Sequence, residues 1–268
     1  MIGAIVGDVI GSAYEFDNVK TKKFPLFTRE TRFTDDTVMT CAVAESLMRS
    51  AKNDYKDLED VAIETFHEVG RRHPACGFGG RFYRWMMGDV WVPYGSCGNG
   101  SAMRISPVGD IAKTPEEAIE LANVLTRITH DHPEGLKGAE AAAVAKVMLK
   151  GGVKLNRVES FIDEYYYKMD KTVSELRAET DGHGAELCQV SMPQAFTCLF
   201  DGVDFEDVIR NCVSIGGDSD TVAAIAGGIA EAVYPVPEEI KELALSFLTP
   251  DLLDIVERWE RFTGGKEG

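Results

Sequence analysis

Long apolar runs, paired cysteines and an excess of basic side chains are all missing from this 268-residue chain. No stretch approaches the roughly 18 uninterrupted apolar residues that a membrane-spanning helix needs, so we expect no membrane association. The first residues, Met1 to Asp8, contain no basic leader, and Asp8 interrupts their apolar run, which argues against a signal peptide. The six cysteines have no CxxC or CxxH spacing, which predicts free thiols and a cytoplasmic location.

The charge balance is strongly acidic, with 44 Asp and Glu against 28 Lys and Arg and a formal net charge of −16. Such a balance opposes a general affinity for nucleic acid or anionic membranes. It leaves an anionic substrate open, because a bound dication reverses the local field. One segment departs from the trend: residues 19–33 carry five basic side chains and a single acid, Glu30. A solvated loop is the favoured interpretation of this segment, and a basic lid near a phosphate-bearing ligand is the alternative.

Helical spacing of apolar residues dominates the chain, and strand signals are few. We predict helices over 37–48, 115–128, 138–150, 221–233, 238–248 and 251–262. The best strand candidates, 90–94 and 187–192, are short. The length suits one sizeable core, and no flexible linker or fixed-period repeat divides it. The predicted fold is therefore a single all-α domain over residues 1–263, followed by a frayed tail at 264–268.

Two short clusters of acids and hydroxyls lie far apart in the chain, and each precedes an apolar helical run. They are Thr34-Asp35-Asp36-Thr37 and Asp218-Ser219-Asp220-Thr221. Carboxylates at a helix start commonly act as caps, which is one interpretation of both clusters. The same oxygen ligands suit hard cations such as Mg²⁺, Mn²⁺ or Ca²⁺, which is the other. Two clusters facing each other would supply four acids, enough for a binuclear site that polarises a substrate and activates water.

A glycine-rich segment runs from Gly95 to Arg104 through Ser96, Cys97, Gly98 and Asn99. Glycine lets backbone N–H groups approach a phosphate closely, and consecutive amides can form an anion-binding nest. The segment matches neither the P-loop nor the dinucleotide fingerprint, so a plain loop is the alternative. The same two interpretations apply to Gly77-Phe78-Gly79-Gly80.

His130 and His132 lie two residues apart at the end of a predicted helix. Their side chains should point in different directions, so we do not expect them to share a metal. His130 alone could contact a ligand, and a helix C-terminal histidine without a role is the alternative. Glu15, a lone acid after an apolar stretch, could equally be an ordinary surface residue.

Together these motifs resemble the ADP-ribosylglycohydrolase family. The match runs in family order through Gly3–Asp8 with Glu15, Phe33–Met39, Gly98–Arg104, Thr129-His130 and Ser214–Thr221. It covers the chain from residue 2 to about 235. The resemblance implies an all-α, single-domain, orthogonal multi-helix fold with two Mg²⁺ or Mn²⁺ ions in a central cleft. It implies the hydrolysis of the glycosidic bond that links ADP-ribose to a modified acceptor, such as an Arg or Ser side chain.

The resemblance also assigns roles by position. The implied metal ligands are Thr34, Asp35, Asp36, Asp218, Asp220 and Thr221. Glu15 and Asp35 or Asp36 would share the acid–base work, because carboxylates stabilise oxocarbenium character and activate water. The diphosphate and ribose would lie on Gly95, Ser96, Cys97, Gly98 and Asn99, with His130 against the ligand and Gly77 and Phe78 on the adenosine side. The expected partner is the ADP-ribose moiety of a modified protein or small molecule, and the protein itself is expected to be a monomer.

Cys97 departs from the family pattern, because some relatives carry an aromatic residue there. The stretch Asp163 to Gly184 matches nothing in the family and could shape the acceptor side of the cleft. Two other functions remain open. A non-catalytic ADP-ribose-binding or structural member of the fold would be expected to lose acids from one cluster, and both are complete here. A metal-dependent hydrolase of another nucleotide or phosphoester is disfavoured by the Gly98–Arg104 motif.

Overall fold

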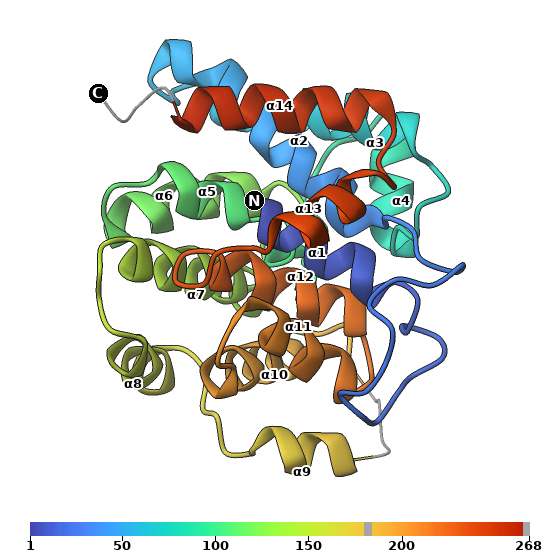
Figure 1. The fold of residues 1–268 in the computed structure, drawn as a ribbon. Helices are drawn as coiled ribbons and strands as arrows, with labels where there is room; N and C mark the ends of the chain where they lie inside the picture. The colour runs from blue at the N-terminus through green and yellow to red at the C-terminus, as the bar shows by residue number, and fades with distance from the viewer. Residues whose placement is uncertain (180–183, 265–268) are drawn as a thin grey trace.

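A computed structural model describes residues 1–179 and 184–264, and in this part the chain is almost entirely helical (Figure 1). Its only β-type pairing is an isolated bridge between Gly98 and Leu187. The α-helices are α1 Ile2–Gly11, α2 Asp35–Ser50, α3 Leu58–Arg72, α4 Gly80–Met87, α5 Ser106–Ile111, α6 Pro115–Arg127, α7 Pro133–Lys150, α8 Leu155–Tyr165, α9 Val173–Ala178, α10 Cys188–Asp201, α11 Phe205–Ser214, α12 Ser219–Ala230, α13 Glu238–Leu245 and α14 Pro250–Gly264. Two short 3₁₀ turns, η1 Ala51–Asn53 and η2 Asn99–Ser101, complete the set.

The helices predicted from apolar spacing all exist, and the all-α prediction is confirmed. The largest boundary error lies at α7, which begins at Pro133 instead of 138 because Pro occupies its first helical position and His132 caps it. The expected tail begins at Gly264, the last residue of α14, while 265–268 lie outside the described residues. None of the described helices combines the length and the apolar character that crossing a bilayer requires.

Neither strand candidate forms a strand. Residues 188–192 begin helix α10, where Cys188, Met192 and Ala195 continue at helical spacing into the core. Residues 90–94 have no regular secondary structure, and Val90, Trp91 and Val92 are exposed. Both predictions were wrong because β-branched and apolar residues favour strands only where a partner strand covers them.

Helices α1 and α12 lie against each other at the centre of the molecule (Figure 1). Their contact is so close that a Cβ added at Gly7 would lie 2.1 Å from the Ala223 carbonyl oxygen. At Gly11 an added Cβ would lie 2.4 Å from the Cα of Asp220. Only glycine permits this approach of two backbones, and the approach brings Asp8 of α1 beside the first turn of α12.

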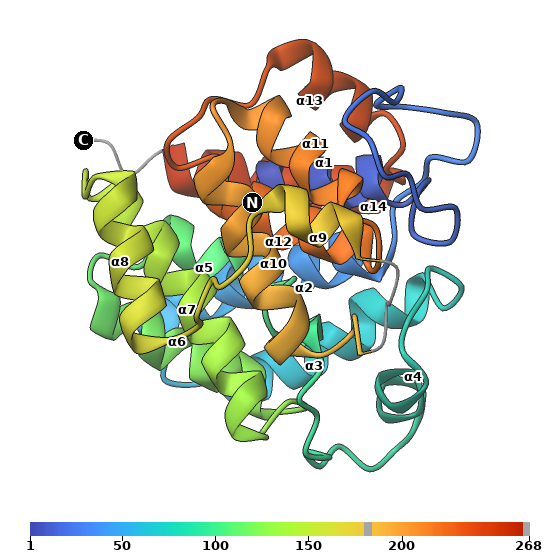
Figure 2. The ribbon, with the colours of Figure 1, turned by 90° about the horizontal axis from the view of Figure 1, so that it is seen from below.

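The connection between α1 and α2 spans residues 12–34 without regular helix. It lies on the same side of the molecule as α4 (Figure 2). Both contribute to the cleft described below, the connection through Glu15, Phe16 and Arg32 and the helix through Arg81 and Phe82.

Candidate active site

The two acid clusters stand at the N-termini of α2 and α12, as the sequence predicted. Thr34 is the N-cap of α2 and its hydroxyl accepts a hydrogen bond from the Asp36 amide at 3.3 Å. Asp218 is the N-cap of α12. The Thr221 hydroxyl donates to Asp36 Oδ2 at 3.2 Å, across 185 residues of chain. The fold therefore joins the two clusters into one site.

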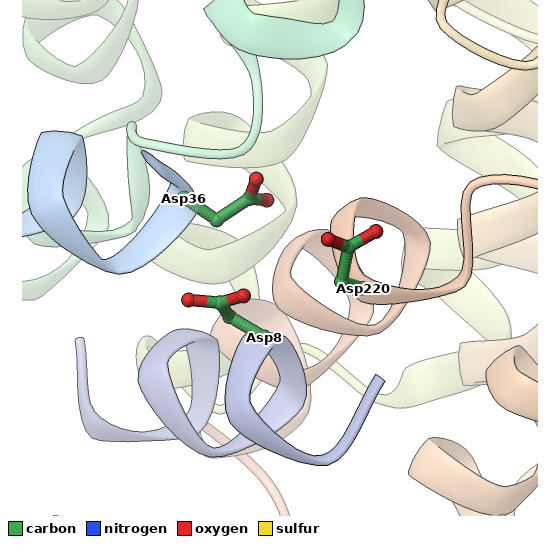
Figure 3. Close-up of side chains that lie close together, drawn as sticks. All are labelled: Asp8, Asp36 and Asp220. Carbon is green, nitrogen blue, oxygen red and sulfur yellow. The ribbon is translucent and has the colours of Figure 1, made fainter. Parts of the chain in front are cut away.

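A third acid, Asp8 of α1, lies between the two clusters, and its carboxylate converges with those of Asp36 and Asp220 (Figure 3). Sequence reasoning assigned Asp8 no role in the site. The signal was present, because Asp8 is the only charged residue between Met1 and Tyr14. A lone acid buried in an apolar helix needs hydrogen-bond donors or a cation to compensate it.

The carboxylate oxygens fit hard metal ions in number and in chemistry. Asp8, Asp36 and Asp220 each offer one oxygen within 4.8 Å of the others, and so do Glu15, Asp218 and Asp220. Asp220 belongs to both groups. Asp36 Oδ1 and Asp220 Oδ1 are buried and accept no hydrogen bond from the described residues. Buried carboxylate oxygens without donors are costly, and a dication with oxygen preference would satisfy them.

The pKa values of these acids also indicate that the site lacks a compensating cation. Burial and the neighbouring Asp8 raise the pKa of Asp35 to about 8. Burial, Asp8 and Asp35 hold the pKa of Asp36 well above its ordinary value, and burial with Asp218 and Asp36 does the same for Asp220. Like charges in a low-dielectric site repel one another strongly, so each carboxylate resists ionisation unless a cation enters.

The acids form one end of a cleft of about 530 Å³. Of the residues predicted for the site, those that line it are Glu15, Thr34, Asp35, Asp36, Gly77, Ser96, Cys97, Gly98, Asn99, His130, Asp218, Asp220 and Thr221. The residues that also line it but were not predicted include Phe16, Arg32, Arg81, Tyr94, Arg104 and Glu186. Clefts of this size hold ligands as large as nucleotides.

The glycine-rich segment connects the acidic end to the rest of the cleft. Asn99 Nδ2 donates to Asp218 Oδ2 at 2.7 Å, so the segment and the second acid cluster hold each other in place. The backbone N–H of Asn99 donates to the Glu186 carbonyl at 2.8 Å, and the backbone N–H of Cys188 donates to the Cys97 carbonyl at 3.1 Å. These bonds form the small bridge that fixes the segment against the start of α10.

Positive charge gathers beyond this segment. Arg104 is fully buried, and Arg81 lies over the Tyr94 ring with its guanidinium carbon 4.9 Å from the ring centre. His130, also buried, lines the cleft beside them. Burial, Arg104 and Arg81 hold the pKa of His130 well below its ordinary value, so its ring is neutral at pH 7. Among the described residues, the cleft therefore has an acidic end and an end that carries Arg81 and Arg104.

Two predicted residues do not line the cleft. Gly95 has a positive φ of 64° and its amide donates to Asp131 Oδ1 at 2.6 Å, just outside. The Phe78 ring stacks on Phe82 at 5.3 Å between ring centres. Gly77 lies beside the acids, because a Cβ there would be 3.0 Å from Asp35 Oδ1.

The basic segment 19–33 is mostly tied to the protein surface. Lys22 pairs with Asp207, Lys20 donates to the Ile215 carbonyl, and only Arg32 of its basic residues lines the cleft. His132 caps α7 instead of facing His130. The described part of 163–184 contributes no residue to the cleft lining, and 180–183 lie outside the described residues.

Comparison with known proteins identifies the family and the fold. A model of the ADP-ribosylglycohydrolase family matches residues 1–264. ADP-ribosylhydrolase ARH3 of Mus musculus is 24% identical, over 94% of this chain and 88% of that protein. The ADP-ribosyl-dinitrogen reductase glycohydrolase of Rhodospirillum rubrum is 25% identical, over 88% of this chain and 85% of that protein.

Among solved structures, an ADP-ribosylglycohydrolase-related protein complex has the same fold. Its TM-score is 0.66 at 23% identity, and the match covers 92% of this chain and 95% of that one. This chain has the same all-helical architecture, and carboxylates from two helix starts converge in its cleft. The chain belongs to the ADP-ribosylglycohydrolase family.

Proposed function

We propose that this protein is a Mg²⁺- or Mn²⁺-dependent hydrolase that cleaves the glycosidic bond between ADP-ribose and a modified acceptor, releasing ADP-ribose. One observation carries the proposal: a single cleft has converging buried carboxylates at one end and cationic side chains at the other. ADP-ribose has matching ends, because its distal ribose offers hydroxyls to metal ions and its diphosphate is anionic. The family membership and the named relatives support the same reaction class.

The metal ligands in this proposal are Thr34, Asp35, Asp36, Asp218, Asp220 and Thr221. Bound ions there would polarise ribose hydroxyls and lower the pKa of a coordinated water. The sharing of Asp220 by the two carboxylate groups supports two ions over one. Asp8 is assigned a positioning role, because its oxygens accept four hydrogen bonds from the Thr34 and Thr37 side chains and amides. The other two acids of its carboxylate group, Asp36 and Asp220, are the proposed ligands.

The diphosphate in this proposal lies over the glycine-rich segment, between the acids and the arginines. Ser96, Cys97, Gly98 and Asn99 line this middle part of the cleft. Arg81 and Arg104 supply a field that favours an anion there, and the overall charge of −16 makes such a local field unusual in this chain. Arg81 covers one face of the Tyr94 ring, and in this proposal the adenosine extends towards these two residues.

Glu15 and Asp35 or Asp36 are the proposed acid–base residues. Glu15 is half-buried at the cleft, where burial and the neighbouring Asp218 raise its pKa. Arg32 Nη2 lies 4.0 Å from Glu15 Oε2. Cleavage at the anomeric carbon develops positive charge on the ribose ring, which nearby carboxylates stabilise. A carboxylate that accepts a proton from the attacking water leaves the oxygen nucleophilic towards the same carbon.

A two-part experiment tests the proposal. The purified protein is given Mg²⁺ or Mn²⁺ and Arg-, Ser- and Asp/Glu-linked ADP-ribosyl peptides, and released ADP-ribose is measured. Thermal unfolding with and without Mg²⁺ is compared for the wild type and Asp36→Asn. We expect release from at least one linkage, and a Mg²⁺-dependent rise in the melting temperature that the variant lacks.

Metal binding without release from any linkage would contradict the hydrolase and favour a non-catalytic ADP-ribose-binding member of the fold. Isothermal titration with free ADP-ribose then distinguishes a binder from a purely structural protein. The linkage that is cleaved fastest defines the acceptor class.

A further inference from the structure

Arg104 is the largest fully buried side chain in the described part of the protein, yet it forms no ion pair there. Its guanidinium carbon lies 4.8 Å from the centre of the Phe66 ring and 5.8 Å from that of Phe82. Burial lowers its pKa to about 10, so it remains a cation at neutral pH. Burying an arginine costs several kcal/mol of folding free energy unless its N–H groups donate hydrogen bonds. The acceptors of those hydrogen bonds therefore indicate what Arg104 does.

One of those donors begins a short chain of hydrogen bonds that ends in the cleft. Arg104 donates to the Thr129 hydroxyl at 2.8 Å and to the Leu125 carbonyl at 3.3 Å. The Thr129 oxygen lies 2.8 Å from His130 Nδ1. Thr129 has no exposed surface, so water does not compete for its hydroxyl. Arg104, Thr129 and His130 therefore form a buried relay, defined here by these three residues.

The relay determines which nitrogen of His130 carries the proton. An arginine only donates hydrogen bonds, so the Thr129 oxygen must accept from Arg104. The single hydroxyl hydrogen of Thr129 then has one acceptor among its hydrogen-bond partners in the described part of the chain, His130 Nδ1. Protonation of Nδ1 would leave that hydroxyl hydrogen buried without an acceptor, which is unfavourable. In the neutral ring the proton must therefore reside on Nε2.

Nε2 faces the substrate side of the ring. A Cβ built at Gly100 would lie 3.2 Å from this atom and one at Gly98 would lie 3.7 Å from it. Both glycines line the cleft, and their missing side chains leave Nε2 accessible to a ligand. An Nε2–H group at this position is a donor only, suited to a phosphate or ribose oxygen.

We propose that Arg104 and Thr129 are positioning residues that hold His130 as its Nε2–H tautomer, so that the imidazole donates a hydrogen bond to an acceptor oxygen of bound ADP-ribose. The identity of the ligand rests on the proposed function, whereas the tautomer does not. In this arrangement His130 has no lone pair directed into the cleft. It cannot serve as a general base, and the acid–base work is left to the carboxylates.

Two-bond ¹H–¹⁵N correlation of the imidazole rings tests the tautomer in the ligand-free protein. The chain has five histidines, so the His130 signals are assigned by their loss in His130→Gln. We expect the Nε2–H pattern for wild-type His130. A predominantly Nδ1–H ring would overturn the proposal, and this measurement needs no variant of the relay to fold.

The relay itself is tested with Thr129→Val, which removes the hydroxyl, and Thr129→Ser, which keeps it. We expect valine to mix the two tautomers and to weaken binding of ADP-ribose with Mg²⁺ roughly three- to tenfold by calorimetry. Serine should restore the Nε2–H tautomer and the affinity for ADP-ribose. Thr126→Val is the matched control, because Thr126 is equally buried one turn earlier and its hydroxyl has no partner in the described structure.

The outcomes separate the two proposals. Unchanged tautomer and affinity in Thr129→Val would overturn the relay. A wild type with the Nε2–H pattern that fails to bind ADP-ribose would contradict the proposed function and still support the tautomer. If Thr126→Val also mixes the tautomers and weakens ADP-ribose binding, the effect comes from packing and the relay is overturned.

Discussion

The Thr34 hydroxyl donates a hydrogen bond to Asp8 Oδ1 at 2.7 Å, and this pair joins the first helix to the start of the second. The hydroxyl hydrogen is used in that bond and one lone pair accepts the Asp36 amide, so one lone pair of Thr34 remains to face a metal ion. Asp8 Oδ2 also accepts the amides of Thr34 and Thr37, each at 3.0 Å. Asp8 thus acts on the site through its neighbours.

Asp8→Asn should weaken Mg²⁺ binding about 10- to 100-fold, the usual range for a residue that orients a metal ligand. The asparagine amide has one oxygen and cannot accept all the bonds that Asp8 receives, so the Thr34 hydroxyl would lose its fixed direction. Calorimetric titration with Mg²⁺ measures the change. Asp60→Asn, at an exposed acid on α3, is the control and should bind Mg²⁺ as the wild type does. Equal affinity in Asp8→Asn would show that Asp8 does not position the ligands.

Glu15→Gln should lower turnover about 100- to 10,000-fold, the range typical of a lost general acid or base. The amide retains the size of the carboxyl group but cannot take a proton at neutral pH. Affinity for ADP-ribose should change little, because Glu15 is outside the proposed diphosphate contacts. Single-turnover release and calorimetry on the same preparation separate the two effects. Glu30→Gln, in the same connection, is the control, and a Glu15 variant with normal turnover would remove Glu15 from the mechanism.

The helical fold and the helix starts at the two acid clusters could be predicted from this sequence, because both depend on local patterns. Apolar spacing defines α6 and α12, and an acid with a hydroxyl at a helix start is a readable cap. The pairing of Asp36 with Thr221 could be inferred only through the family's motif order. Its physical cause, the close approach of α1 and α12, depends on contacts that no local pattern specifies.

Sequence reasoning assigned no role to Asp8 and Arg104, which act on the site through the side chains that they hold in place. Arg104 was read as the end of a glycine-rich motif, and nothing in its neighbours shows that Phe66 and Thr129 surround it. Asp8 was read as an interruption of an apolar run. Both are charged residues placed among apolar ones, and the fold stabilises them with partners distant in sequence: Thr34 lies 26 residues from Asp8, and Thr129 lies 25 residues from Arg104. An unexplained charge in an apolar segment is therefore the signal to follow.

Gly11→Ala should destabilise the protein by about 1–3 kcal/mol and also weaken Mg²⁺ binding. The new methyl group would lie 2.4 Å from the Asp220 Cα, so α1 and α12 must separate and carry Asp8 away from Asp220. Urea unfolding and Mg²⁺ titration measure the two losses. Gly264→Ala at the end of α14 is the control, because an added Cβ there meets no atom within 4 Å. A loss of stability with normal metal affinity would show that the close approach does not set the ligand geometry.

Lys146→Met should destabilise the fold by about 3–5 kcal/mol at pH 7, because it removes one of the two cations, Lys146 and the Met1 amine, that pair with two buried acids. Lys146 Nζ lies 2.6 Å from both Asp110 Oδ1 and Glu231 Oε1. Burial alone would raise the pKa of each acid, but Lys146, with a smaller share from the Met1 amine, outweighs it and lowers both. Since their folded pKa lies below the unfolded value near 4, their contribution is complete above about pH 5 and is lost as the pH falls further.

The variant should weaken this dependence of stability on pH. Without the Lys146 ammonium group, only the Met1 amine opposes the effect of burial, so the pKa of Asp110 and Glu231 rises and their ionisation stabilises the fold less. The stability difference from the wild type should therefore be largest at pH 7 and shrink towards pH 4, as measured by urea unfolding at several pH values. Lys113→Met, at an exposed position, should stay within about 0.5 kcal/mol of the wild type throughout. A difference that is constant with pH would mean that Lys146 stabilises the core by packing rather than by charge.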